Sequence, residues 1–136
     1  MGFAEDIRER ILVLDGAMGT LLQQGVSEED ILRAYVDAGA DIITTNSFNA
    51  NRISLSEQGK AAMAADQAFQ AAVRARRVAD AASRKVYVAG SIGPTGKSLT
   101  LASNADDPAY RQYGFDEFVE AILPVGRVIC VGGQGK

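Results

Sequence analysis

Four short runs of apolar residues divide the chain and indicate β-strands. Their Val, Ile and Leu residues are consecutive and do not alternate with polar ones, which is typical of strands buried on both faces. Gly or Asn stands within two residues after each run, as expected where a strand ends in a turn. The four predicted strands are Ile11–Leu14, Asp41–Thr45, Val86–Ala89 and Arg127–Val131.

The segment between the first two strands predicts an amphipathic helix. Ser27 and Asp30 have the spacing of a capping box, in which the Ser side chain accepts a bond from a backbone N–H. Apolar residues then recur at helical spacing from Ile31 to Ala38. Gly39 follows at the position where a glycine commonly ends a helix.

Two further helices are expected. The Ala-rich stretch Lys60–Ser83 contains no Gly or Pro, so intrinsic propensity favours a long helix there. A shorter helix over Asp116–Leu123 is expected to stop at Pro124, because proline cannot continue the backbone hydrogen bonds of a helix. The buried stripe predicted for the long helix consists of Ala62, Ala65, Phe69, Ala72, Val73 and Ala79.

The resulting order β-α-β-α-β-α-β implies an α/β fold with a parallel sheet and right-handed crossovers. The length of 136 residues suits a small doubly wound α/β sandwich. It also equals about half of a (β/α)8 barrel, which typically needs about 250 residues. In both architectures ligands bind at the carboxyl ends of the strands, so the loops that follow the strands are the candidate sites.

The first such loop is Asp15-Gly16-Ala17-Met18. A carboxylate directly after a buried strand can hold an amine or a metal ion at the edge of the sheet. A purely structural interpretation is equally simple, with Asp15 as the N-cap of the next helix. The sequence at this loop leaves both interpretations open.

The second loop contains an excess of polar residues over Thr44–Asn51. Asn51, or Ser54 just beyond the loop, can cap the helix that follows. A cap needs only one such residue, so the others, Thr45, Asn46 and Ser47 with Phe48, are candidates for a polar substrate-binding loop.

The third loop, Gly90–Ser98, resembles a phosphate-binding loop but departs from its pattern. That pattern requires Gly, four residues, and then Gly-Lys-Ser or Gly-Lys-Thr. Here Ser91 stands where the first Gly is needed, and Pro94 removes a backbone N–H. An ordinary loop at the end of a strand is therefore favoured over a site for an anion or a nucleotide.

Composition excludes several kinds of chemistry. The chain has 136 residues with no His and one Cys, so it cannot form a Ser-His or Cys-His catalytic pair, a Cys/His zinc site or an internal disulfide. Its net charge of −3 does not suit a nucleic-acid partner.

No apolar segment is long enough to cross a membrane and no signal peptide is present, so a cytoplasmic protein is expected. Cys130 lies in an apolar run and is expected to be buried.

Three motifs in order resemble the homocysteine S-methyltransferase family, and the cobalamin-dependent members of that family resemble the chain most. The motifs are Ile11–Thr20, Ala38–Phe48 and Gly90–Gly96. The resemblance implies the N-terminal half of a (β/α)8 TIM-type barrel, with residues 1–136 forming a partial homocysteine-binding domain. It also implies transfer of a methyl group, from cobalamin or another donor, to a homocysteine thiolate activated by zinc. By that resemblance the substrate-binding residues are Asp15, Gly16, Ala17, Met18, Thr45, Asn46, Ser47, Phe48, Ser91 and Gly93.

The chain also departs from the family pattern. The three zinc cysteines of the family have no counterpart, because Cys130 precedes Gly132 and does not follow a Gly-Gly pair. The family has a longer segment after its first helix that helps to cover the substrate, whereas here Gln24-Gly25-Val26 leads almost directly to Ser27. The resemblance also weakens after about residue 121. A truncated and internally shortened chain, inactive by itself for lack of its zinc ligands, is the expectation. The alternatives are the anion- or nucleotide-binding module above and a non-catalytic fragment that self-associates through open sheet edges.

Overall fold

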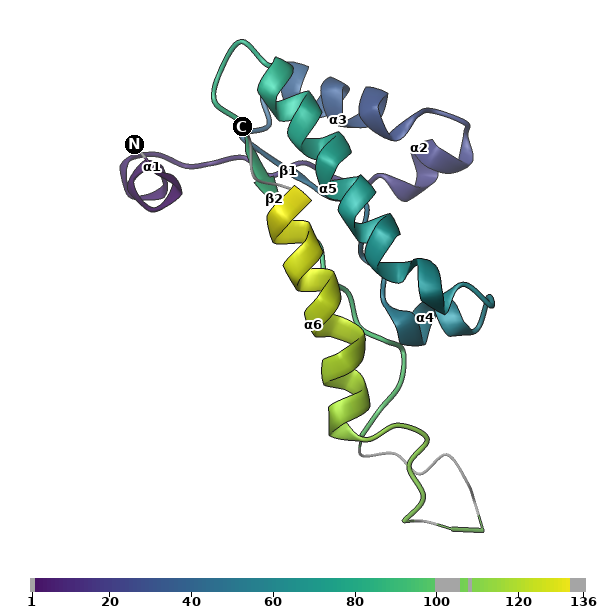
Figure 1. Ribbon diagram of the computed structural model, residues 1–136. Helices are drawn as coiled ribbons and strands as arrows, with labels where there is room; N and C mark the ends of the chain where they lie inside the picture. Colours follow the sequence, from purple (N-terminus) through teal and green to yellow (C-terminus); the bar gives the residue numbers. More distant parts are fainter. Residues whose placement is uncertain (1, 100–105, 108, 133–136) are drawn as a thin grey trace.

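The protein is described by a computed structural model that covers residues 2–99, 106–107 and 109–132. Groups of helices alternate with two short parallel strands (Figure 1). The helices are α1 Phe3–Glu9, α2 Gly19–Gln23, α3 Glu28–Asp37, α4 Arg52–Ser56, the 3-10 turn η1 Ala61–Met63, α5 Ala64–Ala81 and α6 Phe115–Gly132. The strands are β1 Ile42–Thr44 and β2 Tyr87–Ala89.

The sheet is parallel, as predicted, but its first strand is much shorter than predicted. β1 and β2 pair in parallel with Ile43 opposite Val88. The predicted strand Ile11–Leu14 contributes a single parallel bridge, between Leu14 and Ile42. It lies at the edge of the sheet with Ile11 88% exposed, so only one neighbour fixes its conformation.

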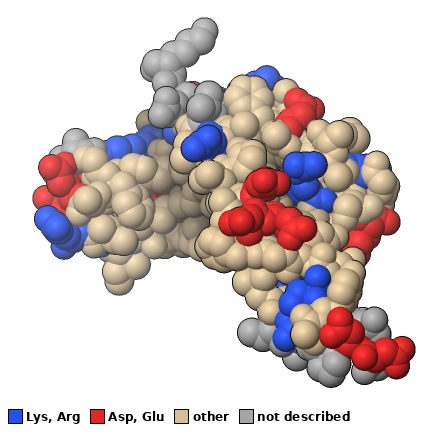
Figure 2. Space-filling view, turned by 60° about the horizontal axis from the view of Figure 1, so that its bottom comes forward, with Lys and Arg blue, Asp and Glu red and all other residues tan. Residues whose placement is uncertain are grey.

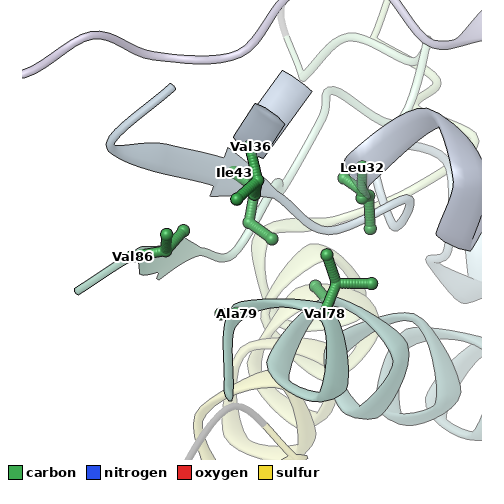
Figure 3. Packing of buried hydrophobic residues seen from close by; sticks show 7 residues of the cluster. Leu32, Val36, Ile43, Val78, Ala79 and Val86 are labelled. Carbon is green, nitrogen blue, oxygen red and sulfur yellow. The ribbon is translucent and has the colours of Figure 1, made fainter. Parts of the chain in front are cut away.

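The core lies on one face of the two strands. Ile43 and Val86 pack against residues from α3 and α5, and Figure 3 shows these apolar side chains converging between the strands and the two helices. The cluster consists of Leu32, Val36, Ile43, Ala75, Val78, Ala79 and Val86. Burial of this apolar surface is the main stabilising contribution of the βα units.

Helix α3 forms as the sequence predicts. The Ser27 side chain accepts a bond from the backbone N–H of Asp30 at 3.2 Å, and Ala38 is the last residue before the turn. Gly39 follows with φ of +107°, in the left-handed region that favours glycine. Both ends of this helix are therefore encoded locally.

Helix α5 is also confirmed, but its buried face differs from the predicted stripe. Ala72 and Ala79 are buried as predicted, whereas Ala62 is exposed and the other predicted positions are half-buried. Small Ala side chains occur on every face of this helix, so the pattern alone does not fix its rotation. The observed face consists of Ala64, Ala68, Ala71, Ala72, Ala75, Val78 and Ala79.

The predicted strand Arg127–Val131 and the predicted helix end at Pro124 are both wrong. α6 continues through Pro124 to Gly132. Ala121, Val125 and Ile129 recur every four residues and are all buried, and Val125 and Ile129 cluster with Ala68 and Ala72 of α5 and with Ala50. Figure 1 shows α5 and α6 side by side. Tertiary packing on an Ala-rich surface thus outweighs both the proline and the β-propensity of the segment.

This helical conformation also corrects the expectation for Cys130. The residue follows Ile129 in α6 and is exposed. The apolar run around it belongs to a helix with one buried face, and Cys130 lies off that face.

Helix α1 is attached to the start of β2 by polar and aromatic contacts. The Asp6 carboxylate accepts bonds from the Tyr87 hydroxyl at 2.5 Å and from the Lys85 ammonium at 3.0 Å. These two donors, Tyr87 first, lower the pKa of Asp6 below its ordinary value. The Phe3 and Tyr87 rings meet edge to face with their centroids 5.1 Å apart.

In the part of the chain that the structure describes, no helix is long and apolar enough to span a membrane.

Candidate functional site

The loops after β1 and β2 are connected by side-chain to backbone hydrogen bonds. The Ser47 hydroxyl lies 2.6 Å from the Thr45 hydroxyl and donates to the Ser91 carbonyl at 2.7 Å. The Ser91 N–H in turn donates to the Thr45 hydroxyl oxygen at 2.9 Å. Thr45 and Ser47 are buried, with exposed fractions of 3% and 2%. Three of the sequence-predicted site residues, Thr45, Ser47 and Ser91, therefore hold together the loops that carry the candidate site.

Asp15 lies at the carboxyl end of the neighbouring edge segment and is fixed by Thr44. Its carboxylate accepts bonds from the Thr44 N–H at 2.8 Å and from the Thr44 hydroxyl at 3.1 Å. Met18, not Asp15, is the N-cap residue of α2, so the capping interpretation of Asp15 is wrong. Two donors hold the carboxylate at the end of the sheet, and the residue remains partly exposed. Such a group can accept from a ligand amine with its remaining lone pairs.

The other residues of the first loop, Gly16 to Met18, pack against Tyr35 and the core. The Tyr35 hydroxyl donates to the Ala17 carbonyl at 2.7 Å. A Cβ atom on Gly16 would lie 2.9 Å from that hydroxyl oxygen, so the loop approaches Tyr35 closely because residue 16 is a glycine. Met18 packs against the core cluster beneath the loop, so its side chain contributes to the core.

Gly93 and Phe48 bring the second and third loops into direct contact. The Gly93 N–H donates to the Phe48 carbonyl at 3.0 Å. A Cβ atom on Gly93 would lie 2.5 Å from that carbonyl oxygen, a distance that the backbone cannot accommodate. The Phe48 ring is 53% exposed and is available as an apolar wall beside these loops.

Asn46 points toward α3 and meets a charged pair that the sequence alone did not single out. Its side-chain amide donates to the Glu28 carboxylate at 3.4 Å. Arg74 of α5 donates to the same carboxylate oxygen at 3.1 Å. In the sequence Glu28 is one of three acidic residues in the first turn of a helix, a pattern that suggests only a favourable helix terminus.

The third loop does not have the contacts of a phosphate-binding loop. The N–H groups of Ser91, Gly93 and Lys97 are already bonded within the protein. The Lys97 ammonium lies 2.6 Å from the Glu57 carboxylate, and this contact raises the pKa of Lys97 and lowers that of Glu57. Among the residues that the structure describes after this loop, the next helix begins at Phe115. These observations argue against an anion or nucleotide at Gly90–Ser98.

Two cavities lie near this region, lined by other residues. One of about 390 Å³ lies beside Asn49 and Thr95, and one of about 220 Å³ lies between α4 and the start of α6, with Arg52 and Glu117 on its rim. On the face drawn in Figure 2, the described Lys and Arg residues lie in small separate groups among acidic and uncharged residues. Charge on this face is therefore mixed and does not form a continuous basic surface.

The sequence of the chain matches a known family, and its fold is similar to that of solved structures. A family model described as homocysteine S-methyltransferase matches residues 12–132. The crystal structure of the homocysteine methyltransferase MmuM from Escherichia coli in its metallated form superposes with a TM-score of 0.69 at 21% identity, over 94% of this chain and 53% of that one. Its oxidized form gives 0.65 at 24% identity, over 91% and 50%. The chain thus spans about half the length of these structures, and the likeness shows a shared α/β fold with parallel strands.

Proposed function

Because the chain belongs to the homocysteine S-methyltransferase family, we propose that it takes part in the transfer of a methyl group to homocysteine. This chain supplies the half of the domain that contains the substrate pocket. In that reaction the homocysteine thiol loses its proton, and its sulfur forms a bond to a methyl group as the bond between that methyl and its carrier, cobalamin or another donor, breaks. The product is methionine. The observation that carries the proposal is Asp15, a carboxylate held at the end of the sheet by two bonds from Thr44.

The proposal gives each part of the site a role. Asp15 binds the ammonium group of homocysteine, since a fixed carboxylate is a strong acceptor for a charged donor. Gly16 allows the first loop to pack closely against Tyr35, Asn46 and Phe48 line the pocket, and the loop at Ser91 and Gly93 forms its floor. Thr45 and Ser47 act through the position of these loops, because their hydroxyls are engaged with each other and with Ser91.

From the family membership we also propose that the βα units form the N-terminal half of a (β/α)8 barrel. Residues 1–136 would then be part of one homocysteine-binding domain. Two observations support this. One face of the sheet is covered by α3 and α5, while Leu14, which pairs with Ile42, is 55% exposed at the edge. The match to solved structures of about twice this length is consistent with such a half.

Zinc is the metal that the family implies, and the residues described here do not fit it. In residues 2–99, 106–107 and 109–132, no three His, Cys, Asp or Glu side chains lie together in a way that could hold a metal ion. Cys130 stands alone on the exposed side of α6. We therefore assign no zinc ligand in this chain and derive no step through a metal.

Self-association is a second proposal, carried by exposed apolar residues at the sheet edge. Ile11, Val13 and Leu14 are 88%, 53% and 55% exposed. A second copy of the chain that paired along this edge would bury these apolar side chains. Sedimentation velocity tests this: association should weaken in an Ile11→Lys variant, and a parent chain that stays monomeric at all concentrations would exclude it.

Calorimetric titration with L-homocysteine tests the main proposal. The parent chain should bind it, and Asp15→Asn should bind it about tenfold or more weakly, because the carboxylate charge is lost while the amide oxygen can still accept from Thr44. The matched control is Asp37→Asn, an exposed carboxylate on α3, which should leave the affinity unchanged. No binding to the parent chain at millimolar ligand, or equal binding by Asp15→Asn, would contradict the proposal.

A further inference from the structure

The Glu28 side chain is buried next to the candidate site in a way that its place in α3 does not require. It stands in the first turn of α3, a position usually exposed to solvent, yet its side chain is only 9% exposed. One carboxylate oxygen accepts from Asn46 and from Arg74. The other is buried and has no hydrogen-bond partner in the part of the chain that the structure describes.

This placement costs stability, because a buried carboxylate oxygen without a donor loses its hydration without compensation. Helix α3 does not need the residue as a cap, since Ser27 already caps it. The neighbouring pair of Glu29 and Arg77 shows how the same two helices can be linked on the surface, at 2.9 Å and with the Arg 67% exposed. Linking α3 to α5 therefore does not explain the burial of Glu28.

The contact with Asn46 supplies an explanation. A carboxylate can only accept hydrogen bonds, so Asn46 must direct its NH₂ group toward Glu28. The amide is planar, and its carbonyl oxygen therefore points to the opposite side, away from Glu28. Arg74 holds Glu28 in place from α5 at 3.1 Å. The orientation of Asn46 thus depends on a charged pair outside the loop.

We propose that Glu28 is a positioning residue that fixes the Asn46 side chain, so that the Asn46 carbonyl accepts a bond from the ammonium group of the substrate. The inference rests on the proposed function and adds Asn46 to Asp15 as a second acceptor for the substrate amine. The Asp15 carboxylate accepts from the N–H of Thr44, and Thr44 lies two residues before Asn46 in the chain. The pocket would then select for a free α-amine through one charged and one oriented neutral acceptor.

The test compares ligands with and without the amine. Glu28→Met removes the acceptor at similar side-chain size, and it should weaken binding of L-homocysteine about fivefold to tenfold. It should leave binding of 4-mercaptobutanoate, which lacks the amine, within about twofold of the parent chain. Glu28→Gln should restore most of the L-homocysteine affinity, because its amide oxygen can accept from Asn46. Glu29→Met is the matched control and should change neither affinity.

A second readout needs no ligand. In the free protein, the side-chain amide signals of Asn46, assigned by their loss in Asn46→Asp, should shift in Glu28→Met and stay unchanged in Glu29→Met. Equal weakening for both ligands in Glu28→Met would mean a merely structural role and would overturn the inference. So would unchanged Asn46 signals. Failure of the parent chain to bind L-homocysteine would overturn the proposed function instead, and the amide signals would still test the orientation of Asn46.

Discussion

The Ser47 hydroxyl, in the loop after β1, donates to the backbone carbonyl of Ser91, in the loop after β2, at 2.7 Å. The bond joins two segments that are 44 residues apart in the sequence. It belongs to a partly buried network with Thr45, whose hydroxyl oxygen accepts from the Ser91 N–H. Two loops that the sequence marks separately as polar are therefore one unit in the folded protein, and its integrity can be tested.

Replacing Ser47 with Ala should destabilise the protein by about 1–2 kcal/mol, because the partly buried Ser91 carbonyl would lose its donor and the buried Thr45 hydroxyl would lose a partner. Urea denaturation measures the change in the free energy of unfolding. Ser56→Ala is the control, since the Ser56 hydroxyl bonds the Ile53 carbonyl within its own helix and the residue is exposed. It should cost less than about 0.5 kcal/mol. Equal effects of the two substitutions would show that the bond between the loops contributes little.

Gly93→Ala should destabilise the protein by about 1–3 kcal/mol, because the added Cβ would meet the Phe48 carbonyl and ring and the two loops would have to separate. Thermal denaturation gives the change. Gly19→Ala is the matched control: it stands at the start of α2, and an added Cβ there meets nothing within 4 Å. The control should be neutral or stabilising by up to about 1 kcal/mol, since Ala favours a helix. A Gly93→Ala variant as stable as the parent chain would refute the close approach.

The contact of α1 with β2 should make stability depend on acid pH through Asp6. The pKa of this carboxyl is lowered in the folded protein, first by the Tyr87 hydroxyl and then by Lys85. Because the pKa is lower in the folded protein, the ionised carboxylate stabilises the fold. This stabilisation is complete above the pKa of the unfolded chain, about 3.9, and is lost as the pH falls through the lower pKa of the folded protein. In Asp6→Asn the loss of stability below about pH 4 should be smaller than in the parent chain. Denaturation curves across this range measure it, and Asp37→Asn should retain the acid loss.

The packing of α6 on α5 should make Ile129 a strong contributor to stability. Ile129→Ala should cost about 2–4 kcal/mol, because the side chain is buried against Ala68 and Ala72. Cys130→Ala, one position along on the exposed side, should change the free energy of unfolding by less than about 0.5 kcal/mol. If segment 127–131 were a strand, the two substitutions would have the opposite pattern or equal effects. Chemical denaturation of both variants decides between these outcomes.

Much of the architecture could be predicted from local patterns. The capping residue Ser27 and the terminal Gly39 determine α3, and consecutive apolar residues indicate β1 and β2. Asn51 caps α4 as one of the two expected candidates, with its side chain accepting from Ser54 N–H at 2.9 Å. These features depend on residues within one turn or one strand, so a short window of sequence contains their physical cause.

The candidate site was predicted less completely. The loops that would carry it follow from the rule that ligands bind at the carboxyl ends of parallel strands. The individual roles did not follow, because a polar residue in a loop has the same sequence signal whether it binds a ligand or another loop. Thr45 and Ser47 hold the loops together, and Glu28, which orients Asn46, lies in a helix.

The sequence by itself determined the alternation of helices with parallel strands, the ends of α3, and the family to which the chain belongs. Only the tertiary structure decided the conformation of residues 124–132. There the local signals, a proline and a run of β-branched residues, oppose a helix, and the packing of Val125 and Ile129 on α5 outweighs them. Packing energy depends on residues that are distant in the sequence, so it cannot be obtained from a local pattern, whereas caps and turns can.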